Sequence, residues 1–435
     1  MKYYFKSLFV IIAVILLPLK AVSQDTVFYK GELVIRETQK LILTLQIITD
    51  KDTTKIAMGS PYQTEKLFPA TKSKITKDSV KFNIADMGVR LRLKYFEGKQ
   101  TLKGSFRQGF LNKEVTFQQT EKLFALLRPQ TPKPPFDYNE KEMTFTNPES
   151  EYVFHGTLTY PKAKDNEEGI ERKYPAVVLV SGSGCQNRDE EIFKHKPFMV
   201  IADYLTKNGI AVFRYDDRGF GSSDTNMYKG TTYDFAKDTR CAVEMLQKQE
   251  MIDENNIFVL GHSEGGMICE ILGSHYDDIR GLILMAAPAV SGKEILLSQT
   301  EAVMRLNGVG ESDITKALEE TETVKYDTSS INGRWLDWFY HFEPSEYLKK
   351  LTMPVLVLQG SKDMQVLCDL NITAMCKYLP KKTKNITEKI YPGLNHLFQH
   401  CNTGNPDEYA VIEETISPEV LEDIRQFINK TIHNK

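Results

Sequence analysis

The sequence has little excess charge of either sign, which argues against a nucleic-acid partner. Its 435 residues include 55 Lys and Arg against 58 Asp and Glu, a formal net charge of -3. The lysines in "KSKITK" and "LPKKTKN" are scattered, and we expect them to lie on solvated faces rather than along a phosphate backbone. The sequence therefore predicts that the protein binds no nucleic acid.

Cysteine is scarce for a chain of this length, which excludes a disulfide scaffold. Six cysteines are present, and their spacing matches no common zinc pattern. Cys368 and Cys376 lie in an expected helix, about 12 Å apart along its axis, which is too far for a bridge. We expect most of the thiols to be packed in the interior. A single disulfide, such as one between Cys368 and Cys401, is left open. No metal or organic cofactor is expected.

The N-terminus contains an apolar run that is too short to span a bilayer. The run extends over ten residues, from Leu8 to Leu17, whereas a membrane-spanning helix takes about 20. Lysines precede it, and the small residues Ala21 and Ser23 occupy the -3 and -1 positions of a cleavage site after Ser23, which together are typical of a secretory signal peptide. No cysteine follows that site to carry a lipid. We therefore expect a signal peptide at 1-23 and an exported protein, periplasmic or secreted, without a stable membrane anchor.

Two parts of the chain follow different patterns. Short segments of alternating apolar and polar residues at 24-127 predict an antiparallel β-rich domain, in which we find no catalytic constellation. It is expected to be a packing or carbohydrate-facing module. The proline-rich segment 128-139 is expected to be a linker. Residues 140-435 alternate strands with helices, and continuous apolar strands such as 176-180 indicate a mostly parallel sheet flanked by helices. A helical insertion at about 291-350 is expected to form a cap.

The motif "GHSEGG" predicts a nucleophile at Ser263. It follows an apolar strand, and small residues on both sides suit a sharp turn from a strand into a helix. A serine hydroxyl needs a base to take its proton, and His396 follows the last expected strand. A carboxylate must hold that imidazole, and Asp363 follows the strand before it. All three lie at strand ends of one sheet, in the order Ser, Asp, His.

Two backbone N-H groups are expected to stabilise the oxyanion. One belongs to Glu264, directly after the nucleophile, whose side chain is expected to turn aside. The other belongs to Ser183, in the glycine-rich loop Ser181-Gly184, because glycines let the backbone approach a substrate.

Several neighbouring residues have competing interpretations. We expect His262, adjacent to the nucleophile, to have a packing role, and His400 is the weaker candidate for the base. Arg218 is expected to hold loops through ion pairs, with Asp217 as the weaker candidate for the acid. In the cap, Trp335 and Phe339 share a helical face, and they either pack the cap onto the main domain or line an apolar pocket.

These motifs resemble one known family. The stretches "SGSGCQNRDE", "YDDRGFGSSD", "GHSEGG", "GSKDMQV" and "GLNH", in this order, resemble bacterial secreted serine esterases of the α/β-hydrolase fold, the EstD-like carboxylesterases in particular. The resemblance extends to the N-terminal module through "MGSPYQTEKLFPA", "GSFRQG" and the proline-rich segment. It implies the same roles for Ser263, Asp363, His396, Ser183 and Glu264. Cys185 departs from the family, where a proline or another small residue is expected. If Cys185 lines the pocket, it narrows the acyl site or makes activity sensitive to oxidation.

We therefore expect a serine hydrolase that cleaves carboxylic esters through a Ser-His-Asp triad and an acyl-enzyme. The substrate is expected to be a small-molecule ester, with acylated sugars among the candidates. A serine peptidase acting on short peptides is one alternative, because the same groups attack amides. A non-catalytic cell-envelope binding protein is the alternative of another class. The oligomeric state is left open.

Overall fold

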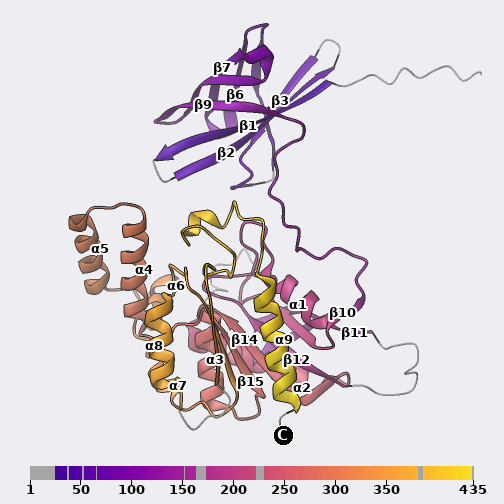
Figure 1. Cartoon of the computed structure of the whole chain (residues 1–435), viewed down its shortest axis with the longest axis vertical. Helices are drawn as coiled ribbons and strands as arrows, with labels where there is room; N and C mark the ends of the chain where they lie inside the picture. Colours follow the sequence, from indigo (N-terminus) through magenta and orange to yellow (C-terminus); the bar gives the residue numbers. More distant parts are fainter. Residues whose placement is uncertain are drawn as a thin grey trace, which may run out of the picture. The chain divides into compact units, whose positions relative to one another are not determined.

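The computed structural model describes residues 25-36, 39-50, 53-64, 66-150, 152-162, 173-221, 230-380 and 386-433. The expected signal peptide at 1-23 lies outside the described residues. The chain divides into two compact units, Met1–Ala125 and Leu126–Lys435 (Figure 1). In the described part of the chain, no helix is both long and apolar enough to cross a membrane.

The first unit is one curled antiparallel sheet of nine strands (Figure 1). Their order is β4-β3-β2-β1-β9-β8-β7-β6-β5, so two meanders are joined where β1 pairs with β9. Alternate residues of each strand, such as Phe82, Leu91 and Phe117, fill a core on one face. The predicted β-rich antiparallel domain is therefore present. The strands are β1 (Asp25–Arg36), β2 (Gln39–Asp50), β3 (Thr53–Gly59), β4 (Phe68–Pro69), β5 (Lys72–Ile75), β6 (Ser79–Ile84), β7 (Val89–Phe96), β8 (Thr101–Gln108) and β9 (Leu111–Thr120).

The second unit contains an eight-stranded sheet in the order β10-β11-β13-β12-β14-β15-β16-β17. β10 and β11 are antiparallel to their neighbours, and the pairings from β13 to β17 are parallel. The predicted fold class is therefore confirmed for this unit. The strands are β10 (Tyr138–Asn147), β11 (Tyr152–Pro161), β12 (Tyr174–Val180), β13 (Ala211–Tyr215), β14 (Ile252–His262), β15 (Gly281–Met285), β16 (Val355–Gly360) and β17 (Ile386–Tyr391).

Helices cover both faces of this sheet. α1 (Pro197–Lys207) and α9 (Pro418–His433) belong to the core on one face, together with Val177 and Leu179 of β12. α2 (Thr232–Gln247), α3 (Glu264–His275) and α8 (Cys368–Tyr378) belong to the core on the other face, together with Ala176 and Val178. Burial on both faces explains why β12 is apolar throughout its length.

The expected cap is helical. It consists of α4 (Gly292–Leu306), α5 (Glu311–Thr323), α6 (Ile331–Tyr340) and the short α7 (Ser345–Leu348). Apolar residues of the cap, Ile295 and Phe339 among them, join the core of the second unit.

The proline-rich segment lies against the second unit. The Arg128 guanidinium donates hydrogen bonds to the carbonyls of Phe193, Ala410 and Ile412. The side-chain amide of Gln130 bonds to the backbone of Ile416. Tyr138, placed by the sequence in the linker, begins β10. The segment from Leu126 onward is thus packed as part of this unit.

The disulfide between Cys368 and Cys401, which the sequence analysis left undecided, is not formed. Cys368 and Cys401 are both free thiols. Burial raises the pKa of Cys368 to about 11, which keeps its thiol protonated and unreactive at neutral pH.

Candidate active site

Ser263 occupies a sharp turn between β14 and α3. Its backbone has φ 54° and ψ -119°, a positive-φ conformation that costs energy for a residue with a side chain. A Cβ atom added to Gly261 would lie 2.0 Å from the carbonyl oxygen of Gly265, and one on Gly265 would lie 2.2 Å from that of Val180. The glycines of the motif are therefore required by the close approach of neighbouring backbone segments.

Asp363 and His396 form a buried hydrogen-bonded pair. His396 Nδ1 lies 2.8 Å from Asp363 Oδ2. The same oxygen accepts from the Gln359 side chain at 3.0 Å, and Oδ1 accepts from the N-H groups of Gln365 and Val366. This arrangement fixes the carboxylate and assigns a proton to Nδ1 of His396. Its Nε2 can then accept a proton, which is the state that a general base requires.

Ser263 and His396 line one cavity of about 300 Å³. Gly182, Ser183 and Glu264 also line it. The structure therefore brings the expected nucleophile, base and oxyanion residues to a single cavity, with Asp363 directly behind His396.

The loop after β12 packs closely on the nucleophile. A Cβ atom on Gly182 would lie 3.2 Å from Cβ of Ser263. The N-H of Gly182 donates to Oε1 of Glu190 at 2.8 Å, so it is not available to an oxyanion. The N-H groups of Ser183 and Glu264 remain the predicted donors.

His262 is held away from catalysis by two acceptors. Its Nδ1 lies 2.9 Å from Oε1 of Glu190, and its Nε2 lies 2.9 Å from the backbone carbonyl oxygen of His396. A carboxylate and a carbonyl oxygen both accept hydrogen bonds, so this site favours the protonated ring, in which both nitrogens donate. Burial lowers the pKa of His262, but the negative charge and hydrogen bond of Glu190 outweigh it and raise that pKa. The structure agrees with a packing role for His262.

The other rivals are also engaged elsewhere. His400 is exposed and bonds to Glu414. The Asp217 carboxyl group accepts from the Ser181 hydroxyl, which lies 2.7 Å from Oδ1 and 2.9 Å from Oδ2, and burial raises the pKa of Asp217 to about 8. Arg218 pairs with Asp238 at 2.7 Å, as expected for a residue that holds loops.

The expectation that the Glu264 side chain turns aside is wrong. This side chain is buried, and its Oε1 accepts from the Thr232 hydroxyl at 2.6 Å and from the Trp335 indole N-H at 2.8 Å. Burial raises the pKa of Glu264, opposed by hydrogen bonds from Thr232, Trp335 and Ser183. The donors come from α2, α6 and the loop after β12, so no local pattern in the sequence could reveal them.

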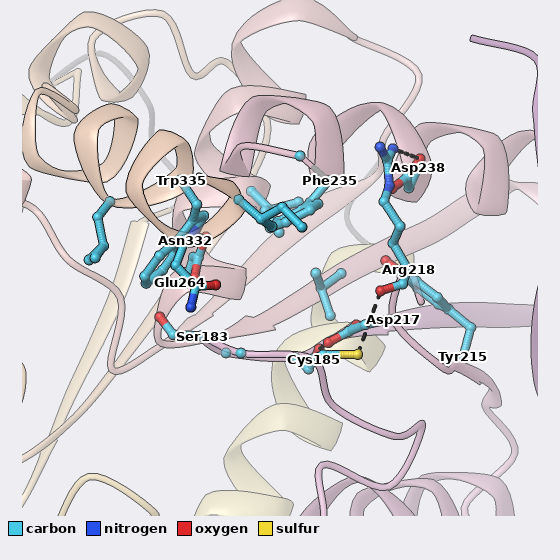
Figure 2. Close-up of a pocket in the computed structure, with 18 of the residues that line it drawn as sticks. Ser183, Cys185, Tyr215, Asp217, Arg218, Phe235, Asp238, Glu264, Asn332 and Trp335 are labelled. Carbon is cyan, nitrogen blue, oxygen red and sulfur yellow. Dashed lines mark hydrogen bonds and ion pairs between the residues drawn. The ribbon is translucent and has the colours of Figure 1, made fainter. Parts of the chain in front are cut away.

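A larger cavity of about 880 Å³ adjoins the first, and Figure 2 shows residues that line it. The two cavities share Gly182, Ser183, Glu264 and Trp335. Four aromatic side chains line the larger cavity, together with polar ones: Phe154, Tyr215, Phe235 and Trp335, with Arg218, Asp238 and Asn332. We call it the aromatic chamber.

The three residues that the sequence analysis proposed for the substrate pocket, Cys185, Trp335 and Phe339, lie in different places. Cys185 lines the aromatic chamber, with Sγ 3.5 Å from the carbonyl oxygen of Arg218. Trp335 lies between the two cavities, whereas Phe339 lines the smaller one and is also part of the core. Glu190, which the sequence analysis missed, joins the oxyanion loop to His262.

The described residues include no group of three or more His, Cys, Asp or Glu side chains arranged to hold a metal ion. The polar groups at the site are a serine, a histidine and carboxyl groups, with backbone N-H donors. This set suits nucleophilic acyl transfer, in which the serine attacks and the histidine moves the proton.

The fold and the site define a hydrolase of the α/β-hydrolase class, and comparisons with known proteins agree. The model of a hydrolase family described as serine aminopeptidase, S33, matches residues 195-332. Esterase EstD of Thermotoga maritima is 28% identical over 308 residues, which cover 67% of this chain and 70% of that protein. Dipeptidyl-peptidase 5 of Porphyromonas gingivalis is 24% identical over 52% of this chain and 31% of its own length.

Solved structures with a similar arrangement include Est1E of Butyrivibrio proteoclasticus with ferulic acid bound. It is 19% identical, with a TM-score of 0.44 over 67% of this chain and 99% of that chain. The α/β-hydrolase GrgF of a Penicillium species is 16% identical, with a TM-score of 0.45 over 67% of this chain and 99% of that chain. The resemblance of this chain to EstD-like serine esterases is confirmed, as is its expected class, a carboxylic ester hydrolase.

Proposed function

We propose that the protein cleaves carboxylic esters through Ser263, His396 and Asp363, with an acyl-enzyme intermediate. The hydrogen bond between His396 Nδ1 and Asp363 Oδ2, 2.8 Å long and buried behind the cavity that Ser263 lines, carries this proposal. It orients the imidazole and stabilises the positive charge that the ring acquires.

The reaction follows from these positions. Ser263 Oγ attacks the ester carbonyl while His396 Nε2 takes its proton. The resulting oxyanion is stabilised by the backbone N-H groups of Ser183 and Glu264. His396 then protonates the leaving alcohol, and a water molecule activated by the same histidine cleaves the acyl-enzyme.

The aromatic chamber supports a proposal for the substrate. A cavity of about 880 Å³ beside the nucleophile has room for a bulky group of the ester. Its rings can pack against a planar or cyclic group, and its carboxyl groups can accept hydrogen bonds from hydroxyl groups. We therefore propose a small-molecule ester with such a group, with acylated sugars among the candidates. The proposed place of action is outside the cytosol, on the strength of the residues at 1-23.

The test compares esters with amides. The chain from Gln24 onward and its Ser263→Ala variant are assayed with p-nitrophenyl esters of increasing acyl length and with aminoacyl p-nitroanilides. We expect ester cleavage by the unmodified chain and its loss in the variant. Ester turnover that survives in Ser263→Ala contradicts the mechanism. Cleavage of anilides alone favours the short-peptide peptidase that the aminopeptidase family model suggests. Failure to react with both kinds of substrate and with a fluorophosphonate, which labels active serine hydrolases, favours the non-catalytic binding protein.

A further inference from the structure

The two units of the chain carry charges of opposite sign. Residues 25-125 contain 18 Lys and Arg against 11 Asp and Glu, a formal net charge of +7. Residues 126-435 contain 34 against 47, a formal net charge of -13. The small net charge of the whole chain therefore conceals a basic N-terminal unit.

Eight basic side chains of this unit lie on one face of four neighbouring strands, β5 to β8. All eight are exposed, and the residues that alternate with them along the strands, such as Phe82 and Leu91, fill the core. We call these eight residues the basic face. The strand register arranges them in three rows, which are Lys72, Arg90 and Arg107, then Lys74, Lys81 and Arg92, then Lys94 and Lys103.

The spacing of the basic face follows from sheet geometry. Neighbouring strands lie about 4.8 Å apart, and successive rows lie about 7 Å apart. The other side chains of these four strands on the same side include Asn83, Ser79 and Ser105, but neither Asp nor Glu. The next strand contributes Glu114, opposite Ser105. Positive charge is thus concentrated over four strands.

Several of these charges oppose each other directly across the sheet. Lys81 of β6 lies opposite both Lys74 and Arg92, Arg90 lies opposite Arg107, and Lys94 lies opposite Lys103. Like charges in such positions destabilise a sheet. Within the described part of this unit, none of the eight forms an ion pair. A face with mixed charges would avoid this repulsion. On the basic face, an anionic partner would offset it.

A fully exposed aromatic side chain adjoins the first row. Phe110 lies in the turn between β8 and β9, after Gly109, and is fully exposed. Arg107, near the end of β8, is close to it in the chain. An exposed phenyl ring beside basic residues suits the boundary between lipid headgroups and acyl chains. A soluble polyanion would engage the charges but would not bury this ring.

We propose that the basic face and Phe110 dock the protein reversibly on an anionic lipid bilayer. Headgroup phosphates lie against the three rows, and the Phe110 ring enters the interface. Each basic residue near such a surface strengthens binding about fivefold. The contact weakens as salt is added, because charges are screened beyond about 8 Å at physiological ionic strength. This contact is reversible, unlike a membrane anchor, and it does not depend on the proposed ester hydrolysis.

The test measures sedimentation with vesicles. The chain from Gln24 onward is used, since the apolar run Leu8 to Leu17 would itself enter lipid. We expect binding to vesicles of phosphatidylcholine with phosphatidylglycerol, and none to phosphatidylcholine alone. Combined Lys74→Gln, Lys81→Gln and Arg92→Gln substitutions should weaken binding on the order of 100-fold. The matched control is Lys55→Gln, Lys66→Gln and Lys122→Gln, which removes the same charge from exposed positions outside the basic face.

Each outcome has one meaning. Arg92 also donates hydrogen bonds to the carbonyl oxygen of Phe82 and to Asn83, so the melting temperature of the triple variant is measured beside that of the unmodified chain to separate loss of binding from loss of folding. Absence of binding to anionic vesicles at low salt overturns the proposal, as does an equal loss in the control. Binding to polygalacturonate or DNA without binding to vesicles identifies a soluble polyanion instead. A Phe110→Ser variant that binds vesicles as tightly as the unmodified chain overturns the insertion of this ring.

Discussion

The indole N-H of Trp335 donates a 2.8 Å hydrogen bond to Oε1 of Glu264. This bond joins helix α6 of the cap to the first turn of α3, one residue after the nucleophile. Both residues line both cavities, so the pair forms part of the wall between the catalytic cavity and the aromatic chamber.

Replacement of Trp335 by Phe removes this hydrogen bond and keeps an aromatic ring. We expect kcat/KM for esters with bulky acyl groups to fall about tenfold, because one bond to a buried carboxyl group is lost. Esters of acetic acid, which need only the smaller cavity, should be affected less. Steady-state kinetics on the two kinds of ester measure the difference.

The control for this prediction is Trp338→Phe. Trp338 lies on the same helix but packs on Phe342, with ring centroids 5.2 Å apart. An equal effect of both substitutions on bulky esters would show that the Trp335–Glu264 bond has no specific role.

The buried ion pair of His262 and Glu190 predicts a pH dependence of stability. The folded-state pKa of His262 is raised above its usual 6.5. The contribution of the His262–Glu190 ion pair to stability is therefore fully present below pH 6.5. It is lost as the pH rises through the folded-state pKa of His262. Glu190→Gln should lower the free energy of unfolding by about 3 kcal/mol at pH 6, because it leaves a buried imidazolium without its counter-charge.

Urea unfolding at pH 6 and pH 9 measures this effect. Tryptophan fluorescence suits the measurement, because both tryptophans, Trp335 and Trp338, belong to the second unit. The exposed pair of His400 and Glu414 offers a control, since His400→Gln should cost under about 1 kcal/mol. A Glu190→Gln variant as stable as the unmodified chain at pH 6 contradicts the imidazolium assignment.

The sequence predicted those parts of the site that depend on strand ends. Parallel strands place their carboxyl ends at one edge, so Ser263, Asp363 and His396 could be assigned to one site from their positions after β14, β16 and β17. Whether they act together stays a prediction. The mechanism assays test it.

Contacts between distant segments could not be predicted in this way. The Glu264 side chain depends on donors from α2 and α6, and Glu190 faces His262 from 72 residues away. The basic face could not be predicted from the sequence for a similar reason. Alternation in "VRLRLKYF" separates inward from outward residues of one strand, but the concentration of charge appears only when the register of four strands is known.

The pairing of Asp363 with His396 predicts a large loss of activity in Asp363→Asn. An amide at this position no longer favours the proton on Nδ1, so His396 loses the tautomer that acts as a base. We expect kcat to fall about 10⁴-fold with little change in KM. Stopped-flow or steady-state assays with a p-nitrophenyl ester measure the loss.

Asp217→Asn is the matched control, because Asp217 is the rival acid and bonds to Ser181 instead. Its kcat should remain within about tenfold of the unmodified chain, since it touches neither His396 nor the substrate carbonyl. A loss in Asp217→Asn as large as in Asp363→Asn would reassign the acid.

Glu270 of α3 predicts a substitution that stabilises the protein. Its side chain is fully buried, and neither carboxyl oxygen has a hydrogen-bond partner among the described residues. Burial raises its pKa well above 4.5, so the folded chain holds a proton that the unfolded chain releases above that pH. The stability present below pH 4.5 is therefore lost progressively as the pH rises. Glu270→Met, of similar volume and without charge, should raise the free energy of unfolding by about 1 to 3 kcal/mol at pH 7.5.

The gain should shrink when unfolding is measured at pH 4.5, because Glu270 of the unmodified chain is then protonated in the folded state and already half protonated in the unfolded state. Glu270→Gln removes the ionisation but leaves a buried amide, so its gain at pH 7.5 should be smaller than that of Glu270→Met. A gain that is equal at both pH values would show that packing, rather than the proton held by Glu270, limits stability at this position.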